Sequence, residues 1–377
     1  MKLSFPSSLF SRRRFLGSLL AGSGLVLLPS WARAAGEVSG KKKLGVALVG
    51  LGSYSTNQLG PALRKTSHCR LAGVVTGNPA KGKVWAREYG FSEKNVFSYE
   101  TMGRLADQPD IDIVYVVTPN ALHAEHTIAA AKAGKHVICE KPMAVSVAEC
   151  DAMIAACKAA GVRLMIGYRL HYEPNTVELI RLAREKDLGV FMRMNGANGF
   201  RMRTPKSAGN WRADKKLAGG GPLMDMGVYV LQAVCMAKGE AEPKAITAHF
   251  GPVTRPEIFS EIEESIRWEM HFADGAKGDC LASYAENVSR FRAESDEGWA
   301  QLGPPAFYYD TPVLTTSKGR TSLPRVNHQV AQLDGMTLEI LTNQPSVAPG
   351  EMGRRDLAII EAIYSAAQTG RRTNVTV

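Results

Sequence analysis

The sequence predicts an α/β protein of two domains. The N-terminal domain is expected to hold a parallel sheet covered by helices on both faces, and the C-terminal domain is expected to be α+β with a large, mostly antiparallel open sheet. Short, nearly continuous apolar strands alternate with helical stretches up to residue 167, which is typical of a covered parallel sheet. Beyond that point, residues 245–340 alternate apolar and polar side chains, which predicts strands with one exposed face.

The individual elements follow from the same patterns. In the N-terminal domain, strands are expected at 44–49, 71–75, 111–117, 136–139 and 163–166. The helices between them are expected at 58–65, 81–89, 124–133 and 147–159. In the C-terminal domain, the strand pattern at 265–272 runs into an Asp274-Gly275 turn, and a last helix is expected at 357–367.

Composition narrows the class of protein. The chain has 377 residues, of which 45% are hydrophobic and 22% charged, which is ordinary globular composition. Five of its ten net positive charges lie in residues 1–34, which hold no acidic residue, so the remaining 343 residues carry about +5. Without a basic stripe that carries aromatic side chains, we expect no nucleic-acid partner. The six cysteines include no CxxC pair and are expected to be buried thiols. No cluster of residues has the spacing of metal ligands, so no metal site is expected.

The N-terminus resembles an export signal. Arg12, Arg13 and Arg14 begin a twin-arginine pattern, an apolar run covers 15–28, and Ala32-Arg33-Ala34 offers a cleavage site. The run is shorter than the roughly 20 apolar residues of a membrane span, so no stable membrane insertion is expected. We therefore expect cleavage near Ala34 and folded export to the periplasm by the twin-arginine machinery. An uncleaved N-terminal anchor is the alternative. A linker at 35–43 would precede domains at 44–167 and 168–377.

A glycine-rich loop directly follows the first strand. It reads Gly50-Leu51-Gly52-Ser53-Tyr54-Ser55. Gly50 permits a tight turn, and Gly52 lets a pyrophosphate approach the N–H groups of a helix N-terminus. Ser55 stands where the motif usually has its third glycine. A strand before the loop and a helix after it predict a Rossmann dinucleotide-binding domain.

The end of the second strand indicates which dinucleotide binds. NAD sites usually place Asp or Glu about 20 residues after the glycine loop to hold the ribose 2′-hydroxyl. This chain has no carboxylate between Thr76 and Lys81, and Lys81 can meet a 2′-phosphate. NADP is therefore the predicted cofactor. The alternative is a solvated lysine, although a cation in a first helical turn is poorly placed for the helix dipole.

The fourth strand ends in a further loop at the predicted crevice. Thr118 is followed by Pro119 and Asn120, with His123 one turn later. Loops at the carboxyl ends of parallel strands line the ligand crevice, so Pro119, Asn120 and His123 are expected near the cofactor. For His123, a catalytic role and a helix-capping or structural role both remain open.

The predicted catalytic groups come from two segments. Glu140 and Lys141 follow the fifth strand, so Lys141 is expected in the crevice, with Glu140 as a candidate counter-charge. Asp225 and Tyr229 lie four residues apart at the start of a helix and share one face. A phenol can take the proton of an alcohol while hydride passes to a nicotinamide. Its pKa of about 10 calls for a nearby cation, which Lys141 supplies. The alternative is that Asp225 is only a charge in the first turn of the helix and that Tyr229 is only an aromatic side chain of the core.

Four segments together carry a resemblance to a known family. Glu140-Lys141-Pro142, residues 167–174, Trp211-Arg212 and the stretch 219–229 resemble the glucose–fructose oxidoreductase branch of the Gfo/Idh/MocA family. The resemblance runs from about residue 44 to the end, and tyrosine at 229 is typical of that branch. It implies that Tyr229 is the acid/base, assisted by Lys141 and Asp225. It also implies contacts to the cofactor from Gly50, Gly52, Tyr54, Lys81, Lys141, Arg169, Trp211, Arg212 and Tyr308.

The resemblance also implies an activity. We expect a periplasmic NADP-dependent sugar oxidoreductase that oxidises a glucose-like aldose at C1 to the lactone. Tightly bound NADP would pass the hydride to a second, fructose-like sugar and give an alditol. A homodimer or homotetramer is implied as well. The alternatives are an aldose–aldose oxidoreductase, a simple aldose 1-dehydrogenase, an NAD-dependent glycosidase of the same superfamily, and a sugar-binding protein without activity.

Overall fold

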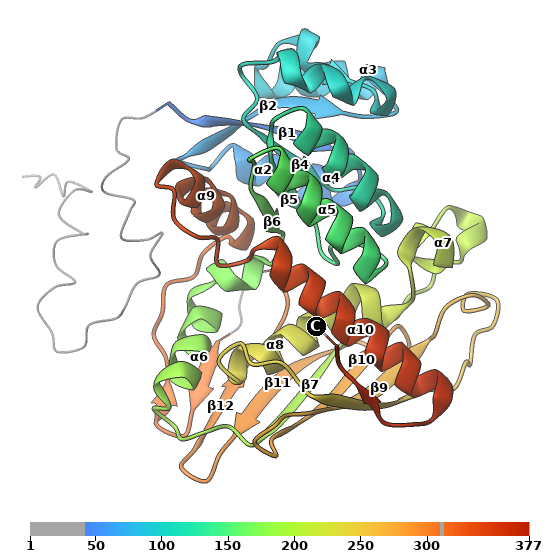
Figure 1. The fold of residues 1–377 in the computed structure, drawn as a ribbon, viewed down its shortest axis with the longest axis vertical. Helices are drawn as coiled ribbons and strands as arrows, with labels where there is room; N and C mark the ends of the chain where they lie inside the picture. The colour runs from blue at the N-terminus through green and yellow to red at the C-terminus, as the bar shows by residue number, and fades with distance from the viewer. Residues whose placement is uncertain (1–41, 310–312, 377) are drawn as a thin grey trace, which may run out of the picture.

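The computed structural model describes residues 42–309 and 313–376, which form two sheets with helices packed against them (Figure 1). The twin-arginine pattern, the cleavage site and nearly all of the linker fall in residues 1–41 and lie outside the described residues. Within the described ranges, no helix has the length and apolar character needed to cross a membrane.

The first sheet confirms the predicted Rossmann architecture. Its six strands are parallel and lie in the order β3-β2-β1-β4-β5-β6, the order of a dinucleotide-binding fold. The strands are β1 (Leu44–Val49), β2 (Cys69–Val75), β3 (Val96–Phe97), β4 (Ile113–Val116), β5 (His136–Cys139) and β6 (Leu164–Ile166). The helices around them are α2 (Gly60–Leu63), α3 (Pro79–Tyr89), α4 (His123–Lys132) and α5 (Val147–Ala159). The two-residue strand β3 was not predicted.

The chain changes direction between β1 and β4. It winds outward from β1 through β2 to β3, and then crosses back to place β4 on the other side of β1. The loops after β1 and β4 therefore diverge and open a crevice at the carboxyl ends of the strands. Every side chain from Val46 to Val49 is fully buried, so the strand that carries the glycine loop is fixed in the core.

The second sheet is mixed but mostly antiparallel, as predicted. Its nine strands lie in the order β14-β13-β12-β11-β7-β10-β9-β8-β15, and only the β7–β10 pair is parallel. The strands are β7 (Arg193–Gly199), β8 (Ala245–Phe250), β9 (Ser265–His271), β10 (Lys277–Ser283), β11 (Val288–Glu294), β12 (Trp299–Leu302), β13 (Leu314–Thr316), β14 (Gly319–Arg320) and β15 (Thr373–Asn374).

Helices cover one face of this second sheet (Figure 1). They are α6 (Pro174–Glu185), α8 (Val228–Ala237) and α10 (Gly350–Thr369). The short α7 (Lys215–Ala218) packs instead against the turn Asn120–Leu122 of the first domain. Single π-helical turns occur at Ser55–Leu59 and Leu223–Gly227. The 3₁₀ segments are Glu93–Asn95, Tyr99–Asp107, Asn120–Leu122, Arg169–Tyr172, Lys206–Ala208 and Trp211–Ala213.

One part of the strand pattern was interpreted wrongly. The alternation assigned to 245–340 ends in a helix, α9 (His328–Leu341), which packs on the N-terminal domain beside α2 (Figure 1). The Asp334 carboxylate accepts hydrogen bonds from the backbone N–H groups of Ser67 and His68 at 2.8–3.0 Å. The chain thus returns to its first domain before it adds β15, the last strand of the second sheet.

All six cysteines are free and buried, as predicted. Burial raises the pKa of each thiol, for example that of Cys69 to about 12. At neutral pH these thiols are protonated and behave as small apolar side chains.

Candidate active site

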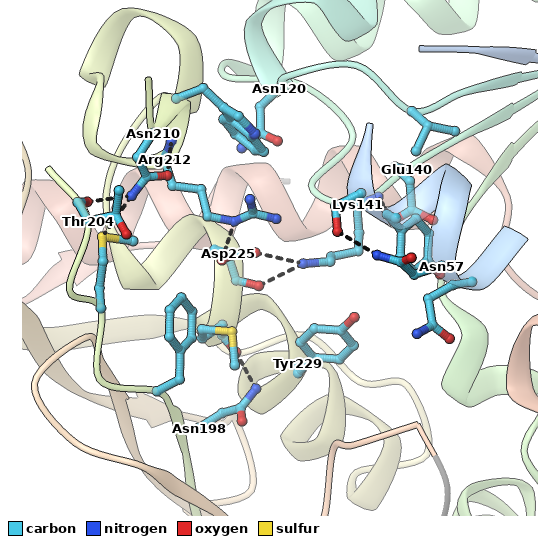
Figure 2. Close-up of a pocket in the computed structure, with 18 of the residues that line it drawn as sticks. Asn57, Asn120, Glu140, Lys141, Asn198, Thr204, Asn210, Arg212, Asp225 and Tyr229 are labelled. Atoms are coloured by element: carbon cyan, nitrogen blue, oxygen red, sulfur yellow. Dashed lines mark hydrogen bonds and ion pairs between the residues drawn. The ribbon is translucent and has the colours of Figure 1, made fainter. Parts of the chain in front are cut away.

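A cavity of about 910 Å³ opens where the carboxyl ends of the first sheet meet the N-terminus of α8 (Figure 2). It collects residues from segments that are far apart in the sequence. The predicted site residues that line it are Tyr54, Asn120, His123, Glu140, Lys141, Arg169, Trp211, Arg212, Asp225, Tyr229 and Tyr308. Those that do not line it are Gly50, Gly52, Thr76, Lys81 and Pro119.

Asp225 lies between two cations at the centre of the cavity. Figure 2 shows Lys141 and Arg212 approaching its carboxylate from opposite sides. The Lys141 ammonium donates to Asp225 Oδ1 at 3.1 Å and to the Asp225 backbone oxygen at 2.8 Å. Arg212 Nε donates to Asp225 Oδ2 at 3.0 Å. These bonds fix the ammonium of Lys141 in position.

The cations determine the charge of Asp225. Burial alone would raise the pKa of this carboxyl, but Lys141, Arg212 and the hydrogen bonds to it hold the pKa well below its usual range. For Lys141, burial would lower the pKa, but Tyr229, Asp225 and Glu140 raise it overall. Both groups are therefore ionised at neutral pH.

Tyr229 lies directly beside this ion pair. The Lys141 ammonium is 4.7 Å from the centre of its ring, and the Arg169 guanidinium carbon is 5.0 Å from the same point. A cation over an aromatic face is attracted by the ring quadrupole. The phenol and the lysine thus lie close together, as predicted. Lys141 lies over the Tyr229 ring and forms an ion pair with Asp225.

A π-helical turn places Asp225 and Tyr229 on the cavity wall. The turn Leu223–Gly227 leads directly into α8, and π-turns inside helices are frequent at functional sites. Its start is held by Glu263, whose carboxylate accepts from the N–H groups of Gly221 and Leu223 at 2.9 and 3.1 Å. A Cβ on Gly221 would lie 2.5 Å from the Glu263 backbone oxygen, so only glycine permits this approach.

The glycine loop has the geometry that a dinucleotide needs. Gly50 has φ +97°, in the left-handed region that favours glycine. A Cβ on Gly52 would meet nothing within 4 Å, so the space above this residue is open. The Ser55 hydroxyl donates to the Gly50 carbonyl at 2.6 Å and closes the turn in place of a third glycine. The N–H groups of the first helical turn have no partner within the helix, so the loop fits a bound pyrophosphate.

Lys81 lies against this loop although it does not line the cavity. Its ammonium donates to the backbone oxygen of Leu51 at 2.6 Å. Asn78 caps the helix by accepting from the Lys81 N–H at 3.0 Å, and Thr76 Oγ1 accepts from the Asn78 N–H at 3.1 Å. An ammonium group has three N–H donors, and the bond to Leu51 uses one of them. The other donors of Lys81 remain for a 2′-phosphate.

Two residues at the end of β4 have structural partners. Asn120 donates to the Ala218 backbone oxygen at 2.8 Å. The ring nitrogens of His123 lie 2.9 and 2.8 Å from the backbone oxygens of Pro142 and Thr118, and burial lowers the pKa of this imidazole to about 4. Neither ring nitrogen is left for a substrate. His123 thus joins the loops after β4 and β5. This arrangement supports the structural role for His123 rather than the catalytic one.

Glu140 is a nearby negative charge that raises the pKa of Lys141, but it does not form an ion pair with it. The Glu140 carboxylate accepts instead from the Tyr115 hydroxyl at 2.6 Å and from the Lys141 backbone N–H at 3.2 Å. Burial raises the pKa of Glu140. Asp225 is the carboxylate that pairs with the ammonium.

Sequence reasoning missed the residues that support the site from the C-terminal domain. Tyr309, next to the predicted Tyr308, lies 4.8 Å from the Arg169 guanidinium. His328 Nδ1 lies 2.7 Å from Arg169 Nη1, and burial lowers its pKa to about 3, so the neutral ring accepts this bond. For Tyr309, the only signal in the sequence was that it follows Tyr308 in a loop.

Family models match both halves of the chain. Residues 44–168 match a model described as an oxidoreductase family with an NAD-binding Rossmann fold. Residues 176–301 match the GFO/IDH/MocA C-terminal domain. The chain belongs to the Gfo/Idh/MocA oxidoreductase family. It is therefore an oxidoreductase that uses a nicotinamide dinucleotide.

Several members of the Gfo/Idh/MocA family are similar along most of their length. The crystal structure of aldose–aldose oxidoreductase from Caulobacter crescentus is 41% identical, with a TM-score of 0.85, and covers 88% of this chain and 100% of its own. D-xylose 1-dehydrogenase [NADP(+)] from Haloarcula marismortui is 28% identical over 86% of this chain and 91% of its own length. 1,5-Anhydro-D-fructose reductase from Ensifer adhaerens is 26% identical over 87% and 97%, respectively.

Within the family fold, Ser53 and Tyr54 of the glycine loop line the same cavity as Lys141 and Tyr229. Lys81 lies against the loop at Leu51, outside the cavity lining. Among the described residues, no group of three His, Cys, Asp or Glu side chains is placed to hold a metal ion.

Proposed function

We propose that this protein is an NADP-dependent sugar oxidoreductase that oxidises an aldose at C1 to the lactone. The observation that carries the proposal is the placement of Tyr229 beside the Lys141–Asp225 ion pair in a cavity next to a dinucleotide loop. The aldose–aldose oxidoreductase and the xylose 1-dehydrogenase among its relatives support an aldose as substrate.

In this proposal, Tyr229 moves the proton. NADP held at the glycine loop and Lys81 would supply the acceptor for the hydride, that is, a proton and two electrons, that leaves the C1 carbon of the sugar. Tyr229 Oη takes the proton of the C1 hydroxyl, so that oxidation leaves a lactone. The Lys141 ammonium stabilises the negative charge that develops on the phenol and on the sugar oxygen. Asp225 holds that ammonium and does not itself exchange a proton, because its pKa lies far below neutral pH.

The proposed cofactor is NADP in tightly bound form. The absence of a carboxylate between Thr76 and Lys81 supports NADP, as does the Lys81 ammonium beside the glycine loop. Export in a folded state would require the cofactor to be loaded in the cytoplasm. Nucleotide released by denaturing the purified protein should be NADP(H).

A second sugar is proposed to reoxidise the bound cofactor. It receives the hydride at its carbonyl carbon while Tyr229 returns the proton to the carbonyl oxygen, which gives an alditol. The 41% identity to an aldose–aldose oxidoreductase favours an aldose as this acceptor, with a fructose-like ketose as the other candidate. A simple aldose 1-dehydrogenase, favoured by the xylose dehydrogenase relatives, would release the reduced cofactor instead.

Periplasmic location is part of the same proposal. The twin-arginine pattern and Ala32-Arg33-Ala34 support export in the folded state and cleavage near Ala34. The periplasm has no pool of free NADP, so a cofactor that stays bound and is recycled by a second sugar suits that compartment. Mass spectrometry of protein from the periplasmic fraction should find the mature chain starting at Ala35.

The experiment is a near-ultraviolet titration of the purified protein without added nucleotide. The absorbance of bound NADPH should rise with an aldose and fall when an acceptor sugar is added. An absorbance that rises and is then found in free nucleotide separated from the protein indicates the aldose 1-dehydrogenase. Cleavage of a chromogenic glycoside without net reduction indicates the glycosidase. No nucleotide and no response to any sugar would overturn the proposal.

A further inference from the structure

A third donor reaches the Asp225 carboxylate from the C-terminal sheet. Tyr284 directly follows β10, and its hydroxyl donates to Asp225 Oδ2 at 3.0 Å. Its side chain is buried and does not line the cavity, so it is not placed to contact a molecule bound there. We infer that Tyr284 is a positioning residue of the reaction proposed above, on which this inference rests. It holds the Asp225 carboxylate so that Oδ1 faces the Lys141 ammonium.

The two carboxylate oxygens of Asp225 have separate partners. Oδ2 accepts from Arg212 Nε and from the Tyr284 hydroxyl, each at 3.0 Å, while Oδ1 accepts from Lys141 at 3.1 Å. A carboxylate held at one oxygen by two donors cannot rotate without losing them. The second oxygen therefore stays available for Lys141, which in turn stays beside the Tyr229 ring.

Tyr284 is the more rigid of the two donors to Oδ2. Arg212 belongs to a single 3₁₀ turn, its side chain is 39% exposed, and its guanidinium stacks on Trp211 at 4.5 Å. Tyr284 is 1% exposed. Its ring packs edge-on against Phe200, with ring centres 5.0 Å apart, and in parallel against Phe259 at 6.2 Å.

A separate apolar cluster surrounds the ring of Tyr284. This Tyr284 cluster is distinct from the main core and consists of Met202, Ala213, Ile258, Phe259, Ile262 and Tyr284, with Phe200 and Met226 packed against it. Ala213 ends the 3₁₀ turn that carries Trp211 and Arg212 to the cavity. The cluster thus joins that turn to the phenol that holds Asp225.

The backbone of Tyr284 is fixed on both sides. Its N–H donates to the backbone oxygen of Glu264 at 2.9 Å. Its carbonyl accepts from the Met202 N–H at 3.0 Å and from Arg255 Nη2 at 2.7 Å. Arg255 in turn pairs with the buried Glu264 carboxylate at 2.8 Å. Neither the ring nor the main chain of Tyr284 can shift without breaking these contacts.

The charged and titratable groups that face Asp225 are Lys141, Arg212 and Tyr284. A hydrogen bond to the ionised form of a carboxyl favours that form. Removing the Tyr284 hydroxyl should therefore raise the pKa of Asp225, without changing either cation. A tyrosine that only fills space would have no such effect.

The test compares Tyr284→Phe with the matched control Tyr172→Phe. Tyr172 is an equally buried phenol that donates to a carboxylate, Glu339 Oε1, at 3.0 Å, and it does not line the cavity. Carbon-13 NMR at neutral pH of protein labelled at the Asp carboxyl carbons follows the Asp225 carboxylate, with its signal assigned by Asp225→Asn. We expect this signal to shift in Tyr284→Phe, which loses a hydrogen-bond donor to Oδ2, and to stay unchanged in Tyr172→Phe.

Activity supplies a second readout. In Tyr284→Phe, kcat for reduction of bound NADP should fall about tenfold, and KM for the aldose should change less than twofold. An equal effect in both variants, or an unchanged Asp225 signal, overturns the inference. A wild-type protein that oxidises no aldose refutes the proposed function alone, because the NMR comparison still decides the role of Tyr284.

A second substitution covers the case in which Tyr284→Phe does not fold. Replacing Tyr284 with 3-fluorotyrosine keeps the ring and the hydroxyl but makes the phenol more acidic. A more acidic donor forms a stronger bond to the carboxylate, so the carbon-13 signal of Asp225 at neutral pH should shift on this substitution. An unchanged signal contradicts the inference.

Discussion

At the residue scale, the chemistry of the site depends on one ion pair and one phenol. Lys141 comes from the loop after β5, whereas Asp225 and Tyr229 come from the start of α8. Asp225 holds the Lys141 ammonium at 3.1 Å and thereby keeps it 4.7 Å from the Tyr229 ring centre. The phenol has its supporting cation only because the two domains meet at this point.

Tyr229→Phe removes the hydroxyl and keeps the ring. Since the phenol is the proposed acid/base, turnover should fall by about 10²-fold or more. The amount of NADP(H) bound per chain should not change, because the glycine loop and Lys81 are untouched. Sugar-dependent absorbance of the bound cofactor measures the first quantity, and release by denaturation measures the second. Full activity in this variant would move the acid/base role to another residue.

Asp225→Asn tests the electrostatics of the ion pair. It leaves Lys141 and Arg212 without their buried partner, which should cost about 3 kcal/mol of unfolding free energy at neutral pH. The pKa of Asp225 is depressed in the folded state, so its stabilising effect is fully present above the unfolded-state value of about 3.9.

The stability difference between wild type and Asp225→Asn should therefore shrink as the pH falls below about 4 toward the folded-state pKa. Urea unfolding of both proteins between pH 7 and pH 3 measures it. A difference that does not change with pH would mean that the charge on Asp225 contributes nothing to stability.

At the element scale, the start of α8 is the most constrained part of the site. Glu263 binds the N–H groups of Gly221 and Leu223, and the Tyr364 hydroxyl donates to the same carboxylate at 2.9 Å. Residue 220 has no room for a side chain, because a Cβ there would lie 2.0 Å from the Tyr364 oxygen.

Gly220→Ala should therefore destabilise the protein by about 1–3 kcal/mol, as overpacking of a tight interior does. It should also lower kcat, since the displaced turn carries Asp225. The matched control is Gly103→Ala, where an added Cβ meets nothing within 4 Å. Thermal unfolding of the two variants gives the comparison. Equal melting temperatures would show that the helix start adapts without cost.

The elements also show what a sequence can predict. The alternation of apolar strands and helices was sufficient for the first sheet, because fully buried strands such as Leu44–Val49 carry a strong local signal. The two residues of β3 carry almost none. Helix α9 was hidden because its apolar side chains face two different neighbours, so its pattern resembled that of the strands before it.

The same limit applies to the site. Lys141, Asp225 and Tyr229 could be predicted from their positions in short motifs, and the structure brings all three together. Tyr284 and His328 could not, because each acts through a contact that spans more than 50 residues of sequence. A buried tyrosine after a strand looks like an ordinary core residue until its hydroxyl partner is known.

At the scale of the whole molecule, the second sheet has one face covered by helices and one face without them among the described residues (Figure 1). We propose that the open face pairs with a second copy of the chain, as the family resemblance implies. Light scattering of the purified protein should give the mass of a dimer or tetramer. A monomer at micromolar concentration would contradict this.

The whole molecule also brings two functions into one cavity. The first sheet supplies the dinucleotide loop, and α8 with its flanking loops supplies the acid/base group. One bound cofactor should therefore serve two sugars in turn, and hydride should not leave the protein between them.

Transfer of deuterium from one sugar to another is the decisive measurement for this shared use of one cofactor. The protein is mixed with an aldose that carries deuterium at C1 and with an unlabelled acceptor sugar of different mass, without added nucleotide. We expect mass spectrometry to find an alditol, formed from the acceptor, that carries one deuterium on its former carbonyl carbon. An alditol without deuterium, or oxidation of the aldose without any alditol, would contradict it.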